Sequence, residues 1–270
     1  MKIYVVNMAR STDRRERIGT LLSSMGLDFE FFSAIDGRVT EITGYDNDRR
    51  LKEKGHGLTP GEMGCFASHR ALWDKCVSLQ ENILILEDDI DFSDNFSTFF
   101  KIADSLTSQY EYIRLGRGPL KALPVFGAYY SLDKRGDKKP YSLVKYLRGP
   151  SCCHGYTLSP VAAEKFLRHS VQWWWPVDDY MDSEYIHHVS NYGIEPPIVL
   201  QTNLPSEIGY ADRENKGKRT IDSRLRKEAY RLSNNIRNNL FNFLFLLSLY
   251  ALSNSATASS FLPAFKSISE

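Results

Sequence analysis

The stretch Asn82-Ile83-Leu84-Ile85-Leu86-Glu87-Asp88-Asp89 decides the fold class of this chain. Its aliphatic run is typical of a strand buried on both faces of a parallel sheet. The acidic residues follow where that strand ends, and ligand sites of open α/β sheets lie beyond the carboxyl ends of their strands. The stretch therefore predicts an α/β domain with an acidic site at one edge of its sheet.

The residues before this strand predict a βαβ unit. Ile3–Val6 reads as a strand, Ser11 as the cap of a helix that ends before Gly26, and Phe29–Ile35 as a second strand. Such a unit is typical of a parallel sheet with helices on its faces.

Further elements follow from local signals. The polar residues 38–58 read as a loop or flap, whereas Thr59-Pro60-Gly61-Glu62 is a capping box that begins a helix through about residue 79. Strands are predicted at residues 110–115, 155–158 and 198–201, and a helix at 160–167. The body therefore reads as one α/β domain over residues 1–212.

Charge and cysteine usage narrow the class of protein. Residues 213–270 carry ten Lys/Arg against four Asp/Glu, so with a total of +1 the first 212 residues carry −5, which argues against a nucleic-acid partner. Cys65, Cys76, Cys152 and Cys153 show no C-x-x-C spacing, which disfavours a zinc site and a disulfide framework. The opening apolar run is too short for a signal peptide, so a cytoplasmic protein is expected.

Residues 213–270 form a tail of a different kind. A basic segment precedes the apolar run Leu240–Tyr250, which is shorter than the roughly 20 residues of a membrane-spanning helix. Such a helix suits peripheral binding to an anionic membrane surface. The alternative is that the apolar run packs onto the domain or forms a homodimer contact.

The acidic cluster indicates metal chemistry. Carboxylates packed at the end of a buried strand repel one another unless a cation compensates, and oxygen ligands favour Mg²⁺ or Mn²⁺ over zinc. The alternative is a solvated acidic turn in which Asp91 or Ser93 caps the next helix.

The chain resembles glycosyltransferase family 25, whose bacterial members act on lipooligosaccharide. The likeness spans roughly residues 2–210. It is carried, in chain order, by Val6-Asn7-Met8-Ala9-Arg10 with Asp13-Arg14-Arg15, Ala34-Ile35-Asp36-Gly37, Leu58-Thr59-Pro60-Gly61-Glu62-Met63-Gly64-Cys65-Phe66-Ala67-Ser68-His69 with Trp73, Leu86-Glu87-Asp88-Asp89, Gly155-Tyr156-Thr157-Leu158-Ser159 and Pro176-Val177-Asp178.

The resemblance implies a GT-A-type fold, a UDP-sugar donor, a divalent metal and an inverting transfer. Beside it, the order of the cluster favours Asp89 as the direct metal ligand, Asp88 as a second ligand or orienting partner, and Glu87 towards the ribose, with all three counted as metal-site candidates. The other residues predicted to bind the donor are Asn7, Arg10, Arg14, Ala34, Asp36, Gly37, His69 and Gly155. The resemblance alone assigns His69 this role, since a lone helical histidine is more often structural.

Inverting transfer needs a base for the acceptor hydroxyl. Asp178, or else Asp179, is the candidate, and both follow Trp173-Trp174-Trp175, whose indoles could form a platform for sugar rings. The alternative places the tryptophans in the core and makes Asp178 the cap of a helix over residues 179–189. His187 and His188 read as part of a surface helix, and Cys152, Cys153 and His154 as strand-edge packing beside the donor pocket.

The functional hypothesis is transfer of galactose or glucose from UDP-galactose or UDP-glucose to a lipid-linked oligosaccharide of bacterial lipopolysaccharide, on the inner face of the cytoplasmic membrane. One alternative is a nucleotidyl- or phosphotransferase with the same acidic metal site, although no Walker-type loop is present. The other is a non-catalytic, membrane-associated carbohydrate-binding protein.

Overall fold

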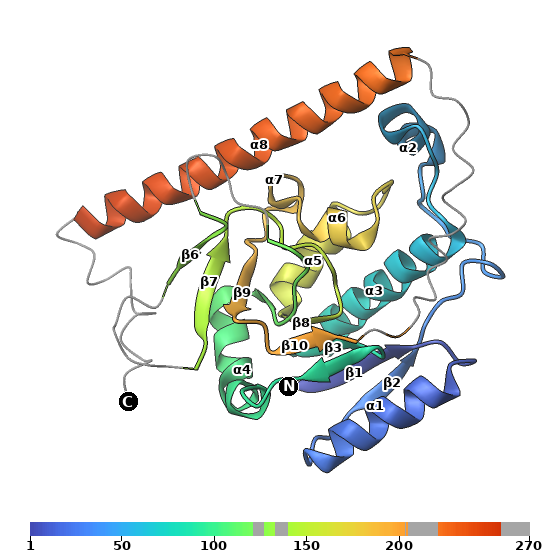
Figure 1. Cartoon of the computed structure of the whole chain (residues 1–270), viewed down its shortest axis with the longest axis vertical. Coiled ribbons are helices and arrows are strands. Elements are labelled where there is room, and N and C mark those ends of the chain that lie inside the picture. The colour runs from blue at the N-terminus through green and yellow to red at the C-terminus, as the bar shows by residue number, and fades with distance from the viewer. Residues whose placement is uncertain (121–126, 133–139, 203, 205–220, 255–270) are drawn as a thin grey trace.

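A computed structural model describes residues 1–120, 127–132, 140–202, 204 and 221–254 (Figure 1). The elements in these residues are, in chain order, β1 (Lys2–Asn7), α1 (Thr12–Ser24), β2 (Glu30–Ser33), α2 (Asn47–Lys54), α3 (Pro60–Leu79), β3 (Ile83–Glu87), β4 (Ile90–Phe92), α4 (Phe96–Tyr110), β5 (Tyr112–Arg114), β6 (Tyr129–Ser131), β7 (Ser142–Tyr146), β8 (Gly155–Leu158), α5 (Pro160–Arg168), α6 (Val177–Met181), α7 (Glu184–His187), β9 (Tyr192–Glu195), β10 (Val199–Gln201) and α8 (Ile221–Asn254).

The central sheet of the described residues has the strand order β2-β1-β3-β8-β5-β9-β7-β6. β1 pairs in parallel with β2 and β3, and β5 with β9, whereas β8 and β7 run antiparallel to their neighbours. Six of these eight strands therefore run in one direction, which confirms the prediction of a mostly parallel sheet within an α/β fold. β4 and β10 form a separate antiparallel pair.

Two apolar cores cover the two faces of the sheet, as the alternation along β3 shows. Ile83 and Ile85 pack in one core with side chains of α3, α5 and α6, and Leu84 and Leu86 pack in the other with side chains of α1 and α4. All four are fully buried. The predicted doubly buried strand is confirmed, and it delivers Glu87 to the end of the sheet.

Local signals place the helix that flanks the site. Thr59 accepts a hydrogen bond from the Glu62 backbone, and the Glu62 side chain accepts one from Thr59 N at 2.9 Å, so the predicted capping box is present. The predicted strands at β1, β2, β5, β8 and β10 and the helices α1 and α5 are also found.

The prediction of a loop over residues 38–58 is wrong in part, because residues 47–54 form α2. Asp46 accepts the Arg49 backbone N–H, and Gly55 ends the helix in the left-handed conformation. Arg49 pairs with Glu53 at 3.0 Å, and Glu53 also accepts the indole N–H of Trp174 at 2.6 Å. The helix thus depends on contacts with residues more than 100 positions away, which polar composition does not reveal.

α8 lies along one side of the domain and crosses α2 and α7 (Figure 1). Lys145 of β7 is buried and donates to Glu184 at 2.6 Å and to Asn242 of α8 at 3.2 Å. The Asn242 amide in turn donates to the Leu147 carbonyl at 2.8 Å.

The proposed division at residue 212 stays a prediction, because residues 205–220 lie outside the described residues.

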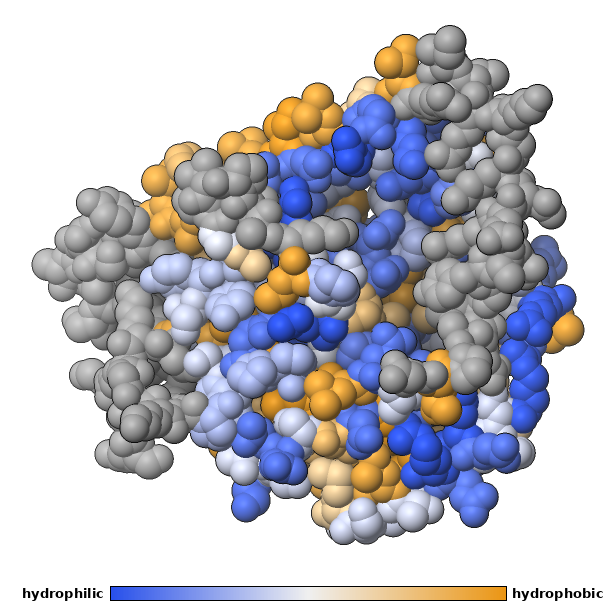
Figure 2. Space-filling view, viewed as in Figure 1, coloured by the Kyte–Doolittle hydropathy of each residue, from blue (hydrophilic) through white to orange (hydrophobic). Residues whose placement is uncertain are grey.

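The opposite side of α8 is apolar and exposed. Figure 2 shows hydrophobic residues along the outer edge of this helix. They are Leu225, Leu232, Ile236, Leu240, Phe243, Leu244 and Leu247. No helix in the described part of the chain combines the length and apolar content that crossing a bilayer requires.

Replacing Asn242 by leucine is expected to lower the free energy of unfolding by about 1–3 kcal/mol, because buried Lys145 loses one of its acceptors and the Leu147 carbonyl loses the amide that donates to it. Urea denaturation measures the loss. Asn239→Leu, at an exposed position of the same helix, is the control and should change stability by less than about 0.5 kcal/mol. Equal stabilities for the two variants would show that α8 does not dock through Asn242.

Candidate active site

The acidic cluster lies at the carboxyl edge of the parallel strands. Val6 of β1 is level with Glu87 of β3, so both strands end at the same place. A cavity of about 670 Å³ opens there. Its lining contains most of the predicted site residues, namely Arg10, Arg14, Ala34, Asp36, Gly37, Glu87, Asp88, Asp89, Asp178 and Asp179.

Asp88 is held by two side chains of the first βαβ unit. Arg14 Nη1 donates to its Oδ1 at 2.8 Å, and Asn7 Nδ2 donates to its Oδ2 at 2.7 Å. Both carboxylate oxygens therefore have protein partners. This geometry favours the orienting alternative for Asp88.

Asp89 differs, because its side chain lacks such a clamp. The residue is 8% exposed, and its Oδ1 is buried with no hydrogen-bond partner. Thr202 fixes the backbone by donating to the Asp89 carbonyl from its N–H and its hydroxyl, both at 2.8 Å. Burial and the nearby Glu87 raise the pKa of Asp89 to about 6.

An unpartnered buried carboxylate oxygen beside two further carboxylates fits a divalent cation. Mg²⁺ and Mn²⁺ take oxygen ligands and commonly keep several waters or substrate phosphates in their coordination shell. Asp89 is the residue best placed to supply a direct ligand, with Asp88 and Glu87 beside it.

The affinity of the protein for Mn²⁺ is expected to fall as the pH drops below about 6, roughly tenfold per pH unit once Asp89 is mostly protonated. A proton competes with the cation for the carboxylate, and the raised pKa brings this competition well above the usual range of an aspartate. Titration calorimetry at pH 7.5, 6.5 and 5.5 measures it. An affinity that is unchanged over this range would remove Asp89 from the ligand set.

The rim opposite the acids is made by the segment after β2. Arg10 pairs with Asp36 at 2.5 Å, and the Arg38 backbone N–H helps to lower the pKa of Asp36. A Cβ added to Gly37 would lie 2.1 Å from the Pro60 carbonyl oxygen. Glycine is therefore required here, because the segment runs directly against the start of α3.

Three residues predicted to bind the donor do not line the cavity. Asn7 is 1% exposed and bonds Asp88. His69 is fully buried behind Glu87, and its Nδ1 lies 2.8 Å from the Tyr156 hydroxyl. Gly155 is buried in β8, and a Cβ there would lie 2.8 Å from Val199 Cγ1. All three therefore support the site indirectly. Asn7 and His69 contact the acidic residues, and Gly155 permits the close packing of β8 on β10.

Glu87 and His69 form a buried pair with Cys153. Glu87 Oε1 accepts from the Cys153 thiol at 2.9 Å and lies 3.5 Å from His69 Nε2. Burial opposes charge on both groups, but His69 outweighs it at Glu87 and lowers the pKa of that carboxyl. Cys153 and Glu87 in turn raise the pKa of His69 to about 10.

The prediction of a tryptophan platform is wrong. Trp173, Trp174 and Trp175 are 1%, 6% and 4% exposed and belong to the core. Trp173 stacks on Phe66 with ring centroids 3.9 Å apart. The alternative, that the tryptophans belong to the core, is confirmed. Three consecutive indoles bury more apolar area in the core than at a pocket edge.

The two candidate bases lie in a short helix rather than before a long one. Residues 179–189 do not form one helix, because α6 and α7 are separate and Pro176 takes the cap position of α6. Asp178 is half-buried and Asp179 is exposed at the cavity. Burial and the charge of Asp179 raise the pKa of Asp178.

His187 is fully buried, so its assignment to a surface helix is also wrong.

An ion pair that the sequence analysis missed supports the far wall. Arg114 of β5 is buried and pairs with Asp182 at 2.6 Å, and it also donates to the carbonyls of Ser151 and Cys152. Ser151 and Cys152 both have positive φ, which costs free energy for residues other than glycine. Arg114 thus holds a strained turn that lines the cavity, and no local pattern predicts this contact.

Basic residues from distant segments complete the lining. Arg50 and Lys54 of α2 and Lys227 of α8 all reach the cavity. Burial lowers the pKa of Lys54. Their charge was visible in the sequence, but their position depends on α2 and α8 packing together.

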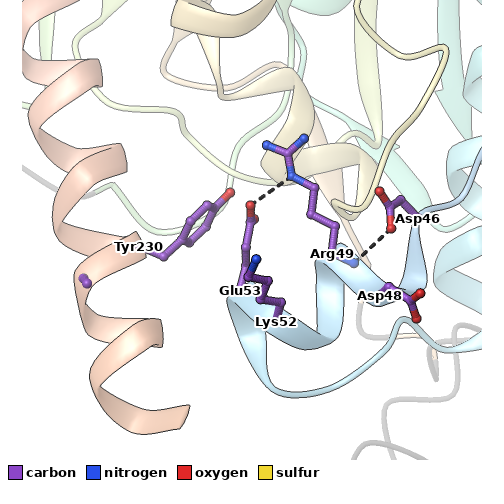
Figure 3. Close-up of a pocket in the computed structure, with 7 residues that line it drawn as sticks. Asp46, Asp48, Arg49, Lys52, Glu53 and Tyr230 are labelled. Carbon is purple, nitrogen blue, oxygen red and sulfur yellow. Dashed lines mark hydrogen bonds and ion pairs between the residues drawn. The ribbon is translucent and has the colours of Figure 1, made fainter. Parts of the chain in front are cut away.

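A second cavity of about 600 Å³ lies between α2 and α8 (Figure 3). Figure 3 shows the Arg49–Glu53 pair facing Tyr230 of α8. The Arg49 guanidinium lies 3.2 Å from the ring centroid of Trp174. These contacts join α2, α8 and the buried tryptophans into one wall beside the acidic site.

Together these features define a mixed α/β domain with an acidic pocket at the carboxyl ends of β1 and β3 and basic side chains around it. The sequence profile described as Glycosyltransferase family 25 (LPS biosynthesis protein) matches residues 1–181, and the chain belongs to this family. The matched region contains every predicted site residue.

Similar proteins include animal members of the family. A Glycosyltransferase 25 family member of Anopheles gambiae is 30% identical over 236 residues, which cover 77% of this chain and 38% of the relative. Procollagen galactosyltransferase 1 of Danio rerio is 26% identical over 77% of this chain and 37% of its own length. The chain thus spans less than two fifths of these relatives. Among solved structures, A197 from STIV is similar over 75% of this chain and 95% of its own length, at 11% identity. Its TM-score of 0.34 is too low to indicate a shared fold.

Proposed function

We propose that the protein is a metal-dependent, inverting hexosyltransferase that moves galactose or glucose from a UDP-sugar to the growing oligosaccharide of lipooligosaccharide or lipopolysaccharide. The observation that carries the proposal is the pocket in which Glu87, Asp88 and Asp89 face Arg10 and Arg14. The pairing of acidic and basic groups suits a diphosphate bound with a divalent cation.

The pocket residues have separate proposed roles in metal binding, phosphate binding and proton transfer. A bound Mn²⁺ or Mg²⁺ would neutralise charge that develops on the departing diphosphate. Asp89 would hold the cation, and Arg10 and Arg14 would attract the phosphates. Asp178 takes the proton of the acceptor hydroxyl while that oxygen bonds to the anomeric carbon from the face opposite the leaving UDP.

Family membership supports glycosyl transfer, and the description of the family as LPS biosynthesis proteins supports a lipopolysaccharide acceptor. The zebrafish relative is named a procollagen galactosyltransferase, so a galactosyl donor is a natural first choice. A nucleotidyl- or phosphotransferase would use the same carboxylates for a different reaction. A non-catalytic binding protein would show no turnover and would not require these carboxylates.

The test is release of UDP from a panel of UDP-sugars with Mn²⁺, with and without EDTA and with a lipooligosaccharide acceptor. Turnover of one donor that EDTA abolishes supports the proposal. Release of pyrophosphate from a nucleoside triphosphate would support a nucleotidyltransferase instead. Binding of oligosaccharide with no dependence on metal and no turnover would support the binding protein.

The position of the enzyme in the cell belongs to the same proposal. We place it on the inner face of the cytoplasmic membrane, held by the exposed apolar residues of α8 and the neighbouring basic charge. An apolar helix edge beside Arg231 and Arg237 suits an anionic lipid surface. A homodimer through the same helix edge is the competing arrangement.

Replacing Leu240 and Leu244 by glutamate is expected to lower binding to anionic phospholipid vesicles by about tenfold or more, because charge enters the apolar edge. Sedimentation with vesicles of phosphatidylglycerol and phosphatidylethanolamine measures it. Val161→Glu and Val171→Glu, at exposed positions elsewhere, are the matched controls. A concentration-dependent dimer that the α8 variant dissociates, with no vesicle binding, would favour the dimer.

A further inference from the structure

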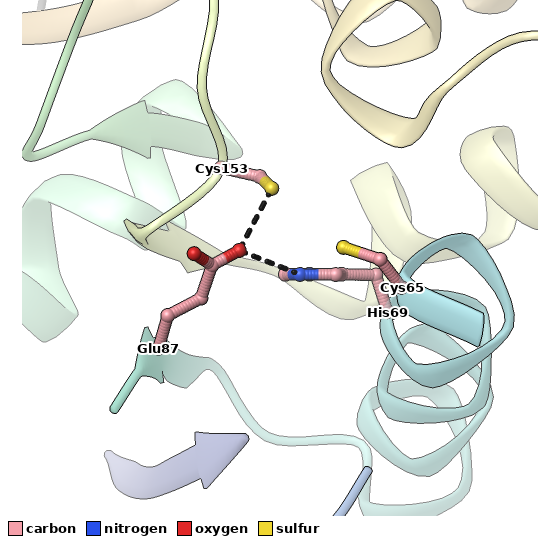
Figure 4. Close-up of side chains that lie close together, drawn as sticks. All are labelled: Cys65, His69, Glu87 and Cys153. Atoms are coloured by element: carbon pink, nitrogen blue, oxygen red, sulfur yellow. Dashed lines mark hydrogen bonds and ion pairs between the residues drawn. The ribbon is translucent and has the colours of Figure 1, made fainter. Parts of the chain in front are cut away.

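Four potential metal ligands meet behind the acidic cluster (Figure 4). Cys65 and His69 come from one face of α3, Glu87 ends β3, and Cys153 precedes β8. The two sulfur atoms, one imidazole nitrogen and one carboxylate oxygen all lie within 4.8 Å of one another. The pocket function proposed above assigns no role to either thiol.

The imidazole of His69 is oriented for a ligand. His69 is fully buried, and its Nε2 points into the cluster, where it forms no hydrogen bond and only an ion-pair contact of 3.5 Å with Glu87 Oε1. Its Nδ1 lies 2.8 Å from the Tyr156 hydroxyl, which also accepts the indole N–H of Trp73 at 3.0 Å. A histidine that binds metal through one nitrogen typically donates from the other to such a partner, which fixes the ring.

The donor set selects the cation. Two sulfurs, one nitrogen and one oxygen are the ligands of a tetrahedral zinc site, whereas magnesium and manganese prefer oxygen. At the usual Zn–S and Zn–N lengths, tetrahedral ligand atoms lie roughly 3.3–3.8 Å apart. Glu87 Oε1 already lies 2.9 Å from Cys153 Sγ and 3.5 Å from His69 Nε2. Because no two of the four ligand atoms are more than 4.8 Å apart, closing the cluster needs shifts of about 1 Å.

An entry path is present. Cys65, Glu87 and Cys153 all line the cavity, and both cysteines are free and only partly buried. A cation in the cavity can therefore reach the sulfur atoms. The spacing of cysteines along the chain could not reveal the cluster, because Cys65 and Cys153 are brought together only by the packing of α3 against β8.

We propose that Cys65, His69, Glu87 and Cys153 form a Zn²⁺ site, separate from the hard-cation site at Asp89. The two sites share a wall, since Glu87 belongs to the same acidic cluster. Binding of zinc replaces the hydrogen bond between the Cys153 thiol and Glu87 by bonds from both groups to the cation. Zinc and manganese therefore occupy neighbouring positions through different ligand chemistries.

The test uses the full chain, reduced and freed of metal, titrated with Co²⁺ as a visible substitute for Zn²⁺. One equivalent is expected to produce sulfur-to-cobalt charge-transfer absorption and tetrahedral d–d bands, which added Zn²⁺ then removes. Cys65→Ser and Cys153→Ser should each weaken or abolish this absorption. Cys152→Ser, which changes the adjacent thiol, is the matched control and should retain it.

Tyr156→Phe provides a test that leaves all four ligands in place. Losing the partner of His69 Nδ1 is expected to weaken Zn²⁺ binding about 10–100-fold in a competition assay with a chromophoric chelator. Circular dichroism establishes that each variant is folded.

Absence of sulfur-to-cobalt absorption in the folded wild type, or an unchanged spectrum in folded Cys65→Ser and Cys153→Ser, would overturn the zinc site. The measurement needs no sugar donor or acceptor. Its failure would leave the glycosyltransferase proposal intact, and the failure of that proposal would leave the zinc site intact.

Discussion

Asp89→Asn is expected to lower metal-dependent turnover of the UDP-sugar by about 10²–10³-fold, because the variant removes the carboxylate best placed to hold the cation beside the leaving diphosphate. UDP release at saturating donor, with Mn²⁺ varied, measures the loss. The requirement for Mn²⁺ should also move to higher concentrations.

The same substitution is expected to act on stability in the opposite direction when no metal is present. The pKa of Asp89 is raised from 3.8 to about 6, so the folded metal-free protein holds the charged form less well than the unfolded chain does. This penalty is absent below about pH 4 and fully present above about pH 6, where it amounts to about 1–3 kcal/mol. Asp89→Asn should therefore raise the free energy of unfolding of the metal-free protein at pH 7.5.

Mn²⁺ is expected to reverse this difference, so that the wild type has a higher free energy of unfolding than Asp89→Asn. Cation binding to the folded state stabilises the wild type by mass action, whereas the variant should respond weakly. Asp91→Asn, which changes an exposed carboxylate two residues further along the chain and outside the cavity lining, is the matched control and should behave as wild type. A variant that keeps both full turnover and the Mn²⁺ stabilisation would place the cation elsewhere.

The parts of the fold that the sequence predicted are those that local interactions specify. The capping box at Thr59 and the apolar run before Glu87 are patterns of residues within a few positions of one another. The first βαβ unit joins strands that follow each other closely in the sequence, with Tyr4 beside Glu30. β7 and β9 were not predicted, although they pair with each other in the sheet. Nonlocal pairing formed these strands where local preference gave no signal.

The same distinction applies to the site. The carboxylates at the end of β3 were predicted because the strand and its acids adjoin in the sequence. The clamp on Asp88 by Asn7 and Arg14 joins residues more than 70 positions apart, and only that geometry favours the orienting role of Asp88 over the role of a second ligand. Lys227 reaches the cavity from α8, which composition had marked only as a basic tail.

Asp178→Asn is expected to lower kcat/KM by about 10²–10⁴-fold while leaving binding of UDP and Mn²⁺ intact, because the base is lost but the metal site remains. Asp178 is the more buried of the two candidates, and burial with the charge of Asp179 raises its pKa. A base whose pKa lies closer to the working pH takes a proton more effectively in the transition state.

Asp179→Asn separates the two carboxylates. The charge of Asp179 helps to raise the pKa of Asp178, so removing it should lower that pKa. Activity falls as the pH drops through the pKa of the base, and the acidic limb of the kcat/KM profile should therefore shift to lower pH in Asp179→Asn with most of the activity kept. Loss of turnover in Asp179→Asn with retention in Asp178→Asn would make Asp179 the base. An unshifted profile in an active Asp179→Asn would show that the base is a group that does not sense this charge.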